Sequence, residues 1–169
     1  MTSNTSSSRV VERVAASMTG AYVAVAGILL LNVSVFLQWA TNDDENGSGF
    51  SGFEADSLNP FMAYLGVGFA VALLYAGKRA YRRQHRGLSL ASMAVGLAVF
   101  LQTVAWVIDV PGAAERPSEL AAGAGVYLAL VGAALWAIGS GLLAKEPEGD
   151  REHDRVHDTA HDDTAGLHR

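Results

Sequence analysis

The sequence contains no cysteine. This absence excludes disulfide bonds, thiolate metal sites, iron–sulfur clusters and cysteine nucleophiles. Charge is also scarce, because Asp, Glu, Lys and Arg make up only 17% of the 169 residues, whereas a soluble domain carries about 25%. The few charged residues are gathered into short blocks, with long uncharged stretches between them. This segregation is typical of an integral membrane protein.

Long apolar stretches fill the sequence between the charged blocks. A hydrocarbon core of about 30 Å is crossed by about 20 helical residues. Four runs approach or exceed this length, at about residues 17–40, 61–77, 88–108 and 120–144. The runs are continuous rather than alternating, which disfavours a β-barrel, and helices satisfy every backbone polar group within hydrocarbon. The sequence therefore predicts an all-α fold, an integral membrane four-helix bundle with up-down-up-down order.

Lysine and arginine alternate from one side of the predicted bundle to the other. The first loop, residues 41–60, contains neither, whereas residues 78–86 contain five of them. Loops rich in these residues stay in the cytoplasm. The pattern predicts a multi-pass plasma-membrane protein with both termini cytoplasmic (N-in/C-in). The N-terminal segment 1–16 and the tail 145–169 then lie in the cytoplasm on either side of the bundle, residues 17–144.

Small residues recur with helical spacing in the first and fourth runs. In lipid, helices associate through close packing of small residues rather than through the hydrophobic effect. The spacing alternates between four and three residues, as in a left-handed seam. The residues are Gly20, Ala24, Gly27, Gly125, Ala129, Gly132 and Gly139. These seams pack the helices within one chain, or one of them is an interface with a second copy or another membrane protein.

Polar residues inside the runs are few. No Lys, Arg, His, Asp or Glu lies in the middle of any run, which argues against a proton-coupled carrier and against a transmembrane haem with histidine ligands. Two interpretations of the remaining polar residues stay open. Asn32 and Gln102 hydrogen-bond to each other and hold two helices together, or they line a polar path with Thr103. No nucleophile–base pair or ligand set exists at membrane depth. We therefore expect no enzymatic activity and no cofactor.

The two loops predicted on the outer face contain most of the non-repetitive polar residues. We expect an outer-face cluster of Trp39, Gly52, Phe53, Glu54, Asp109 and Pro111. Two interpretations of Asp109 stay open. It belongs to a helix-ending turn, because Pro111 disfavours helix at the residue before it, or it contacts the first loop.

The second loop is a dense basic patch. Its members are Lys78, Arg79, Arg82, Arg83 and Arg86. Juxtamembrane clusters of this kind attract anionic lipid headgroups by about 1 kcal/mol per residue near the surface. We expect the patch to set the topology and to contact headgroups, and nothing else in the chain supports nucleic-acid binding.

The tail, residues 145–169, is acidic and poor in apolar residues. We expect it to be disordered, because it cannot bury enough surface to offset the entropy of ordering. His153, His157 and His161 recur every four residues, each followed by an aspartate. On a helix these imidazoles would share one face at a spacing that chelates Zn²⁺. The tail is a solvated low-complexity segment, or it responds to metal or pH.

Several short motifs together carry a family resemblance. They are Trp39 at the end of the first run, the stretch SGFEA at 51–55, Asp109 with Pro111, and the glycines of 125–141. Over about residues 17–144 the chain resembles the small four-helix (tetraspan) membrane proteins of actinobacterial type, although Phe53 stands where tryptophan is usual. The resemblance implies a membrane location and the four-helix architecture. It implies no activity and brings no catalytic residue.

The leading functional hypothesis is a non-enzymatic plasma-membrane protein with a structural or accessory role. The alternative is a subunit of an oligomeric transporter or channel, assembled through the small-residue seams. A weaker alternative is metal or pH sensing by the tail. The lipid bilayer is the partner that the sequence indicates most directly.

Overall fold

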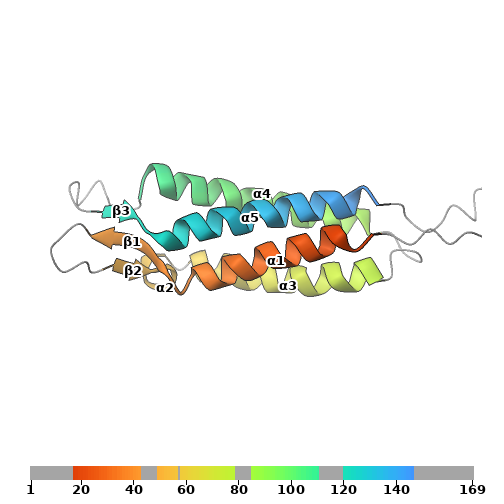
Figure 1. Cartoon of the computed structure of the whole chain (residues 1–169), viewed down its shortest axis with the longest axis horizontal. Helices are drawn as coiled ribbons and strands as arrows, with labels where there is room; N and C mark the ends of the chain where they lie inside the picture. The colour runs from red at the N-terminus through yellow and green to blue at the C-terminus, as the bar shows by residue number, and fades with distance from the viewer. Residues whose placement is uncertain (1–16, 43–48, 57, 79–84, 111–119, 147–169) are drawn as a thin grey trace, which may run out of the picture.

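Four long helices lie side by side in the computed structural model (Figure 1), which describes residues 17–42, 49–56, 58–78, 85–110 and 120–146. They are α1 (Thr19–Ser34), α3 (Leu58–Lys78), α4 (Arg86–Ile108) and α5 (Ala124–Ala144), and a one-turn helix, α2 (Gly52–Ala55), precedes α3. Three of them, α3, α4 and α5, are long and apolar enough to cross a membrane, whereas α1 has only 16 residues. The described part of the chain is thus a mostly helical protein with three candidate membrane spans.

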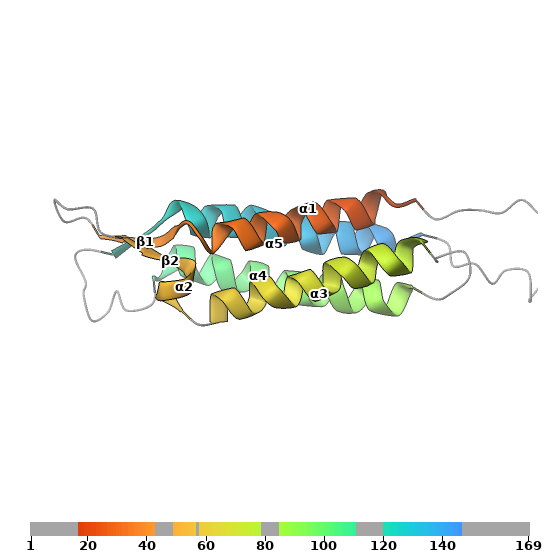
Figure 2. The same cartoon turned by 90° about the horizontal axis from the view of Figure 1, so that it is seen from below.

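A small antiparallel sheet covers one end of the helices. Its strands β1 (Gln38–Asn42), β2 (Gly49–Ser51) and β3 (Leu120–Ala122) stand in the order β2-β1-β3. Ala40 pairs with Phe50 on one side and with Ala122 on the other. We call this the sheet end. The opposite end, where α1 begins and α5 ends (Figure 2), we call the tail end.

The sheet corrects two predicted helices. The first run was expected to stay helical to Ala40, but α1 ends at Ser34 and the chain enters β1 at Gln38; the last run was expected to be helical from Leu120, but that residue begins β3. A short apolar stretch does not by itself distinguish helix from strand. Here strand pairing between segments far apart in the chain decides the matter, so the described fold is not purely α-helical.

Helix α5 is the centre of the bundle, because it packs against both α1 and α4, while α3 packs on α1 and makes little contact with α4. Small residues let α1 and α5 approach closely. A Cβ added to Gly132 would stand 2.7 Å from the Gly27 carbonyl oxygen, and one added to Gly139 would stand 2.6 Å from that of Gly20. The two predicted small-residue sets therefore face each other within one chain.

The contact between α4 and α5 contains polar side chains as well as small residues. The hydroxyl oxygens of Ser92 and Ser140 lie 2.9 Å apart, and the Trp136 indole Nε1 donates to Ser92 Oγ over 2.8 Å. A Cβ on Gly96 would meet the Ala137 nitrogen at 2.9 Å. All three hydrogen-bonding side chains are fully buried. Buried groups of this kind need partners, because an unpaired polar group in an apolar medium costs several kcal/mol, of the order of 2–7.

The predicted hydrogen bond between Asn32 and Gln102 is replaced by another arrangement. The Asn32 amide Nδ2 donates to the carbonyl oxygens of Ile28 at 2.8 Å and Ala63 at 3.0 Å. Asn32 thus links α1 to α3, not to α4. The prediction failed because the sequence does not say which helices are neighbours.

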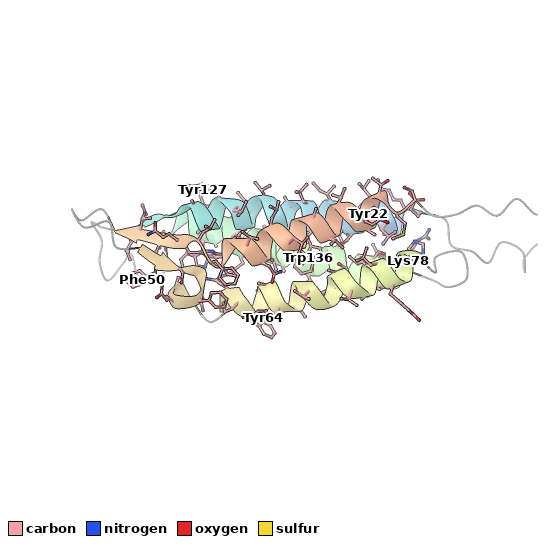
Figure 3. The ribbon with its side chains drawn as sticks, turned by 60° about the horizontal axis from the view of Figure 1, so that its bottom comes forward. Tyr22, Phe50, Tyr64, Lys78, Tyr127 and Trp136 are labelled. Atoms are coloured by element: carbon pink, nitrogen blue, oxygen red, sulfur yellow. The ribbon has the colours of Figure 1, made fainter. Side chains whose placement is uncertain are left out.

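The outward faces of the long helices are apolar. Leu29, Val71, Leu101 and Ile138, one on each helix, are all more than half exposed, between 58% and 65%. Figure 3 shows Trp136 between the helices while Tyr64 and Tyr127 point away from them. Water-soluble helices place polar residues on such faces, so this surface is suited to a lipid environment.

Candidate functional site

The best-built site among the described residues surrounds Trp39 at the sheet end. Trp39 lies in β1 and is only 2% exposed, and its indole Nε1 donates to the Ser34 carbonyl oxygen over 2.9 Å. That carbonyl is close to the end of α1, where intrahelical partners run out. The Trp106 ring of α4 meets the Trp39 ring edge-on, with centroids 5.4 Å apart and planes at 88°. Trp39 therefore joins α1, the sheet and α4.

Two glycines make room for the Trp39 ring. A Cβ added to Gly52 or to Gly125 would stand 2.8 Å from the Trp39 Nε1 atom. Gly52 is also tied in place, because its N–H donates to the Leu37 carbonyl at 3.2 Å and its carbonyl accepts from Asn59 Nδ2 at 3.3 Å. These contacts hold α2 against the ends of α1 and α3.

Phe53 and Glu54 follow Gly52 on α2 and face outward. The Phe53 ring packs at 5.1 Å from the Phe36 ring. One Glu54 carboxylate oxygen accepts hydrogen bonds from the backbone N–H and the hydroxyl of Ser51, both at 2.9 Å. These two donors, the backbone N–H above all, lower the pKa of Glu54 below its ordinary value. Glu54 thus carries a full negative charge at neutral pH.

The rest of the predicted outer-face cluster is only partly assembled. Asp109 is exposed at the end of α4, where its backbone N–H donates to the Ala105 carbonyl at 2.9 Å. Among the described residues its carboxylate has no hydrogen-bond partner in the first loop, so the geometry fits the helix-ending interpretation. Pro111 lies outside the described residues. The sequence places Trp106 near the outer end of its run, as it does Trp39, but the predicted cluster did not include it; the structure buries Trp106 against Trp39.

The tail end has a second set of contacts that sequence reasoning also missed. The buried His85 ring, through Nε2, lies 3.0 Å from the Leu143 carbonyl oxygen, and Arg86 Nε donates to the Ala144 carbonyl at 3.1 Å. Carbonyls in the last turn of a helix lack intrahelical partners and attract positive charge. Arg86 therefore caps α5 in addition to its expected place in the basic patch. Lys78 is exposed at the end of α3.

The other predicted charged sites fall outside the described residues. They are Arg79, Arg82 and Arg83 of the basic patch and His153, His157 and His161 of the tail. Within the described residues, no group of three or more His, Cys, Asp or Glu side chains could hold a metal ion. The described geometry at the sheet end consists of close packing and hydrogen bonds around Trp39.

Comparisons with known proteins identify no relative of this chain. No family model matches the chain, and no curated protein and no solved structure matches it. The resemblance to tetraspan membrane proteins of actinobacterial type stays a prediction.

Proposed function

We propose that the chain is a non-enzymatic integral protein of the plasma membrane with a structural or accessory role, and that it crosses the bilayer four times. The observation that carries the fourth crossing is the length over which α1 lies along α5. A Cβ on Gly20 would stand 2.5 Å from the Leu143 nitrogen, and a Cβ on Gly125 would stand 2.8 Å from the Ser34 oxygen. These contacts join both ends of α1 to the two ends of a candidate membrane span.

The length of α1 agrees with this placement. Its 16 residues rise about 24 Å, and hydrogen-bonded turns at Phe36 and Leu37 continue the chain toward the sheet. A helix that covers a membrane-spanning neighbour over this length shares its depth. The low residue count of α1 arises because the chain leaves the helix at Ser34 and enters β1 at Gln38.

The distribution of charge supports the same depth for all four long helices. Lys78 and Arg86 are their only Lys, Arg, His, Asp or Glu residues, and each stands at a helix end. Both belong to the tail end. The described residues of the sheet end contain acidic side chains but no Lys or Arg. By the positive-inside rule, this asymmetry favours a cytoplasmic tail end and an outer sheet end.

Single cysteines at the two ends of α5 test whether this helix, with α1 packed along it, crosses the membrane and in which orientation, and the cysteine-free chain provides the background. Ala121→Cys is exposed at the sheet end, and Lys145→Cys is exposed at the tail end. With a membrane-impermeant maleimide we expect position 121 to react in intact cells and position 145 to react only after lysis. The opposite pattern would refute the orientation. Reaction at both positions in intact cells would refute the crossing of α5, and with it that of α1, whose two ends lie beside those of α5. A chain soluble without detergent would refute the membrane location.

The geometry gives less support to a transporter or channel subunit. Two of the three polar side chains expected to line a path are engaged within the bundle: Asn32 bridges α1 and α3, and the Thr103 hydroxyl donates to the Phe100 carbonyl at 2.8 Å. The main small-residue seam faces inward, between α1 and α5. Crosslinking in native membranes separates the hypotheses, because an accessory protein is expected to crosslink to a different protein, whereas a self-assembled channel crosslinks to copies of itself.

A further inference from the structure

Two large aromatic side chains stand exposed just beyond the end of α1. Phe36 is 72% exposed and Phe53 is 37% exposed, although their rings pack together. In water such a pair would leave a sizeable apolar surface hydrated. Phe36 lies two residues after α1 ends, so the pair stands where a membrane-spanning helix would leave the hydrocarbon.

The first turns of α3, which lie beside α2, also expose apolar side chains. Leu58 and Phe61, in the first turns of α3, are 37% and 59% exposed. Helix α2, which holds Phe53, is fixed beside these turns by the hydrogen bond from Asn59 Nδ2 to the Gly52 carbonyl. Amphipathic segments that lie in the membrane interface bury Trp, Phe and Leu side chains at the boundary between headgroups and acyl chains. The occupant that suits this surface is therefore the same lipid that surrounds α3.

Helix α2 has one apolar side and one charged side. Phe53 and Glu54 are successive residues, so their side chains leave the helix about 100° apart. The hydrogen bonds that Ser51 donates keep the Glu54 carboxylate ionised, and an ionised group requires water or headgroups around it. If Phe53 faces lipid, Glu54 can face water, so that the apolar and the ionised side chain each have a suitable environment.

We infer that α2 is an interfacial anchor, in which Phe36 and Phe53 insert into the boundary between the acyl chains and the headgroups. The inference rests on the proposed membrane location and adds to it a lipid-binding role for the loop segment. The Gly52 N–H is hydrogen-bonded to the Leu37 carbonyl, and β1 begins at the next residue, Gln38. An anchored α2 would therefore also hold the sheet at a set height above the bilayer. Binding depends on the position of Phe36 and Phe53 relative to the acyl chains, and it does not require one particular headgroup.

Nitroxide labels on single cysteines test the anchor. The variants are Phe36→Cys and Phe53→Cys, with Ala121→Cys as an exposed control on the sheet and Val131→Cys as an exposed control in α5. Each full-length protein is reconstituted into phosphatidylcholine–phosphatidylglycerol liposomes. Collision with oxygen, which concentrates in lipid, is compared with collision with a water-soluble nickel chelate. We expect the oxygen-to-nickel ratio at 36 and 53 to be shifted from that of 121 toward that of 131.

The controls separate failure of the anchor from failure of the membrane location. If position 131 favours oxygen while 53 matches 121, the anchor is wrong and the membrane location stands. If 53 is shielded from both reagents while 131 is not, a protein surface covers α2, and the lipid anchor is again wrong. If position 131 favours the nickel chelate, the proposed membrane location falls, and the anchor falls with it.

Discussion

Adding one methyl group to Gly132 tests whether the α1–α5 seam determines the stability of the bundle. In Gly132→Ala the new Cβ would stand 2.7 Å from the Gly27 carbonyl oxygen and 2.8 Å from the Leu31 nitrogen. The first distance is about 0.7 Å short of the 3.4 Å at which ordinary contact begins. Both opposing atoms are backbone, so no side-chain rotation relieves the overlap and the helices must separate.

Two opposing effects set the size of the change. Replacing glycine by alanine inside a helix stabilises it by roughly 0.5–1 kcal/mol. Overfilling a well-packed contact costs roughly 1–3 kcal/mol. Because the overlap is with rigid backbone, we expect the packing cost to exceed the gain in helix propensity. Gly132→Ala should then lower the free energy of unfolding by about 1–2 kcal/mol.

Gly68 supplies the matched control. It lies in α3, and a Cβ added there would meet no atom within 4 Å apart from the adjacent residues and backbone of its own helix. Gly68→Ala therefore makes the same chemical change without the overlap, and we expect it to be neutral or to stabilise by up to about 1 kcal/mol. Equilibrium unfolding in mixed micelles with increasing dodecyl sulfate, followed by tryptophan fluorescence, compares the two variants. Equal stability of Gly132→Ala and Gly68→Ala would refute the close packing of α1 on α5.

Two further predictions concern hydrogen bonds. Ser92→Ala removes the acceptor of the buried Trp136 indole and the partner of the Ser140 hydroxyl, so we expect it to cost about 1–3 kcal/mol in the same unfolding assay. Ser140→Ala leaves the indole acceptor in place and should cost less; the reverse order would contradict the network. For Glu54, whose folded pKa is lowered, the stabilising contribution is present above the ordinary carboxyl pKa and is lost as the pH falls through the lowered value. Carbon-detected NMR titration in nanodiscs should give a midpoint below the ordinary one, and Ser51→Ala should raise it; a midpoint at or above the ordinary value would count against the Ser51 hydrogen bonds.

The contacts at the tail end illustrate how much of a site the sequence conceals. Arg86 was expected to contact headgroups because it belongs to a basic block, and its hydrogen bond to the Ala144 carbonyl could not be inferred, since 58 residues separate the partners. His85 carries no sequence signal at all, yet its ring is buried against the Leu143 carbonyl. Local composition predicts where charge goes, but not which distant carbonyl it meets.

Composition and spacing alone determined that this is a mostly helical protein with helices long and apolar enough to cross a membrane, because long uncharged runs are a local property of the sequence. They also placed glycine and alanine on one face of the first and last runs, since the 4-3 spacing is a property of a single helix. Only the tertiary structure decided that these faces meet each other, that α1 ends at Ser34, and that residues 38–42 form the central strand of a sheet. Those outcomes depend on contacts between segments far apart in the chain, such as Trp39 with Trp106, and no local pattern specifies them.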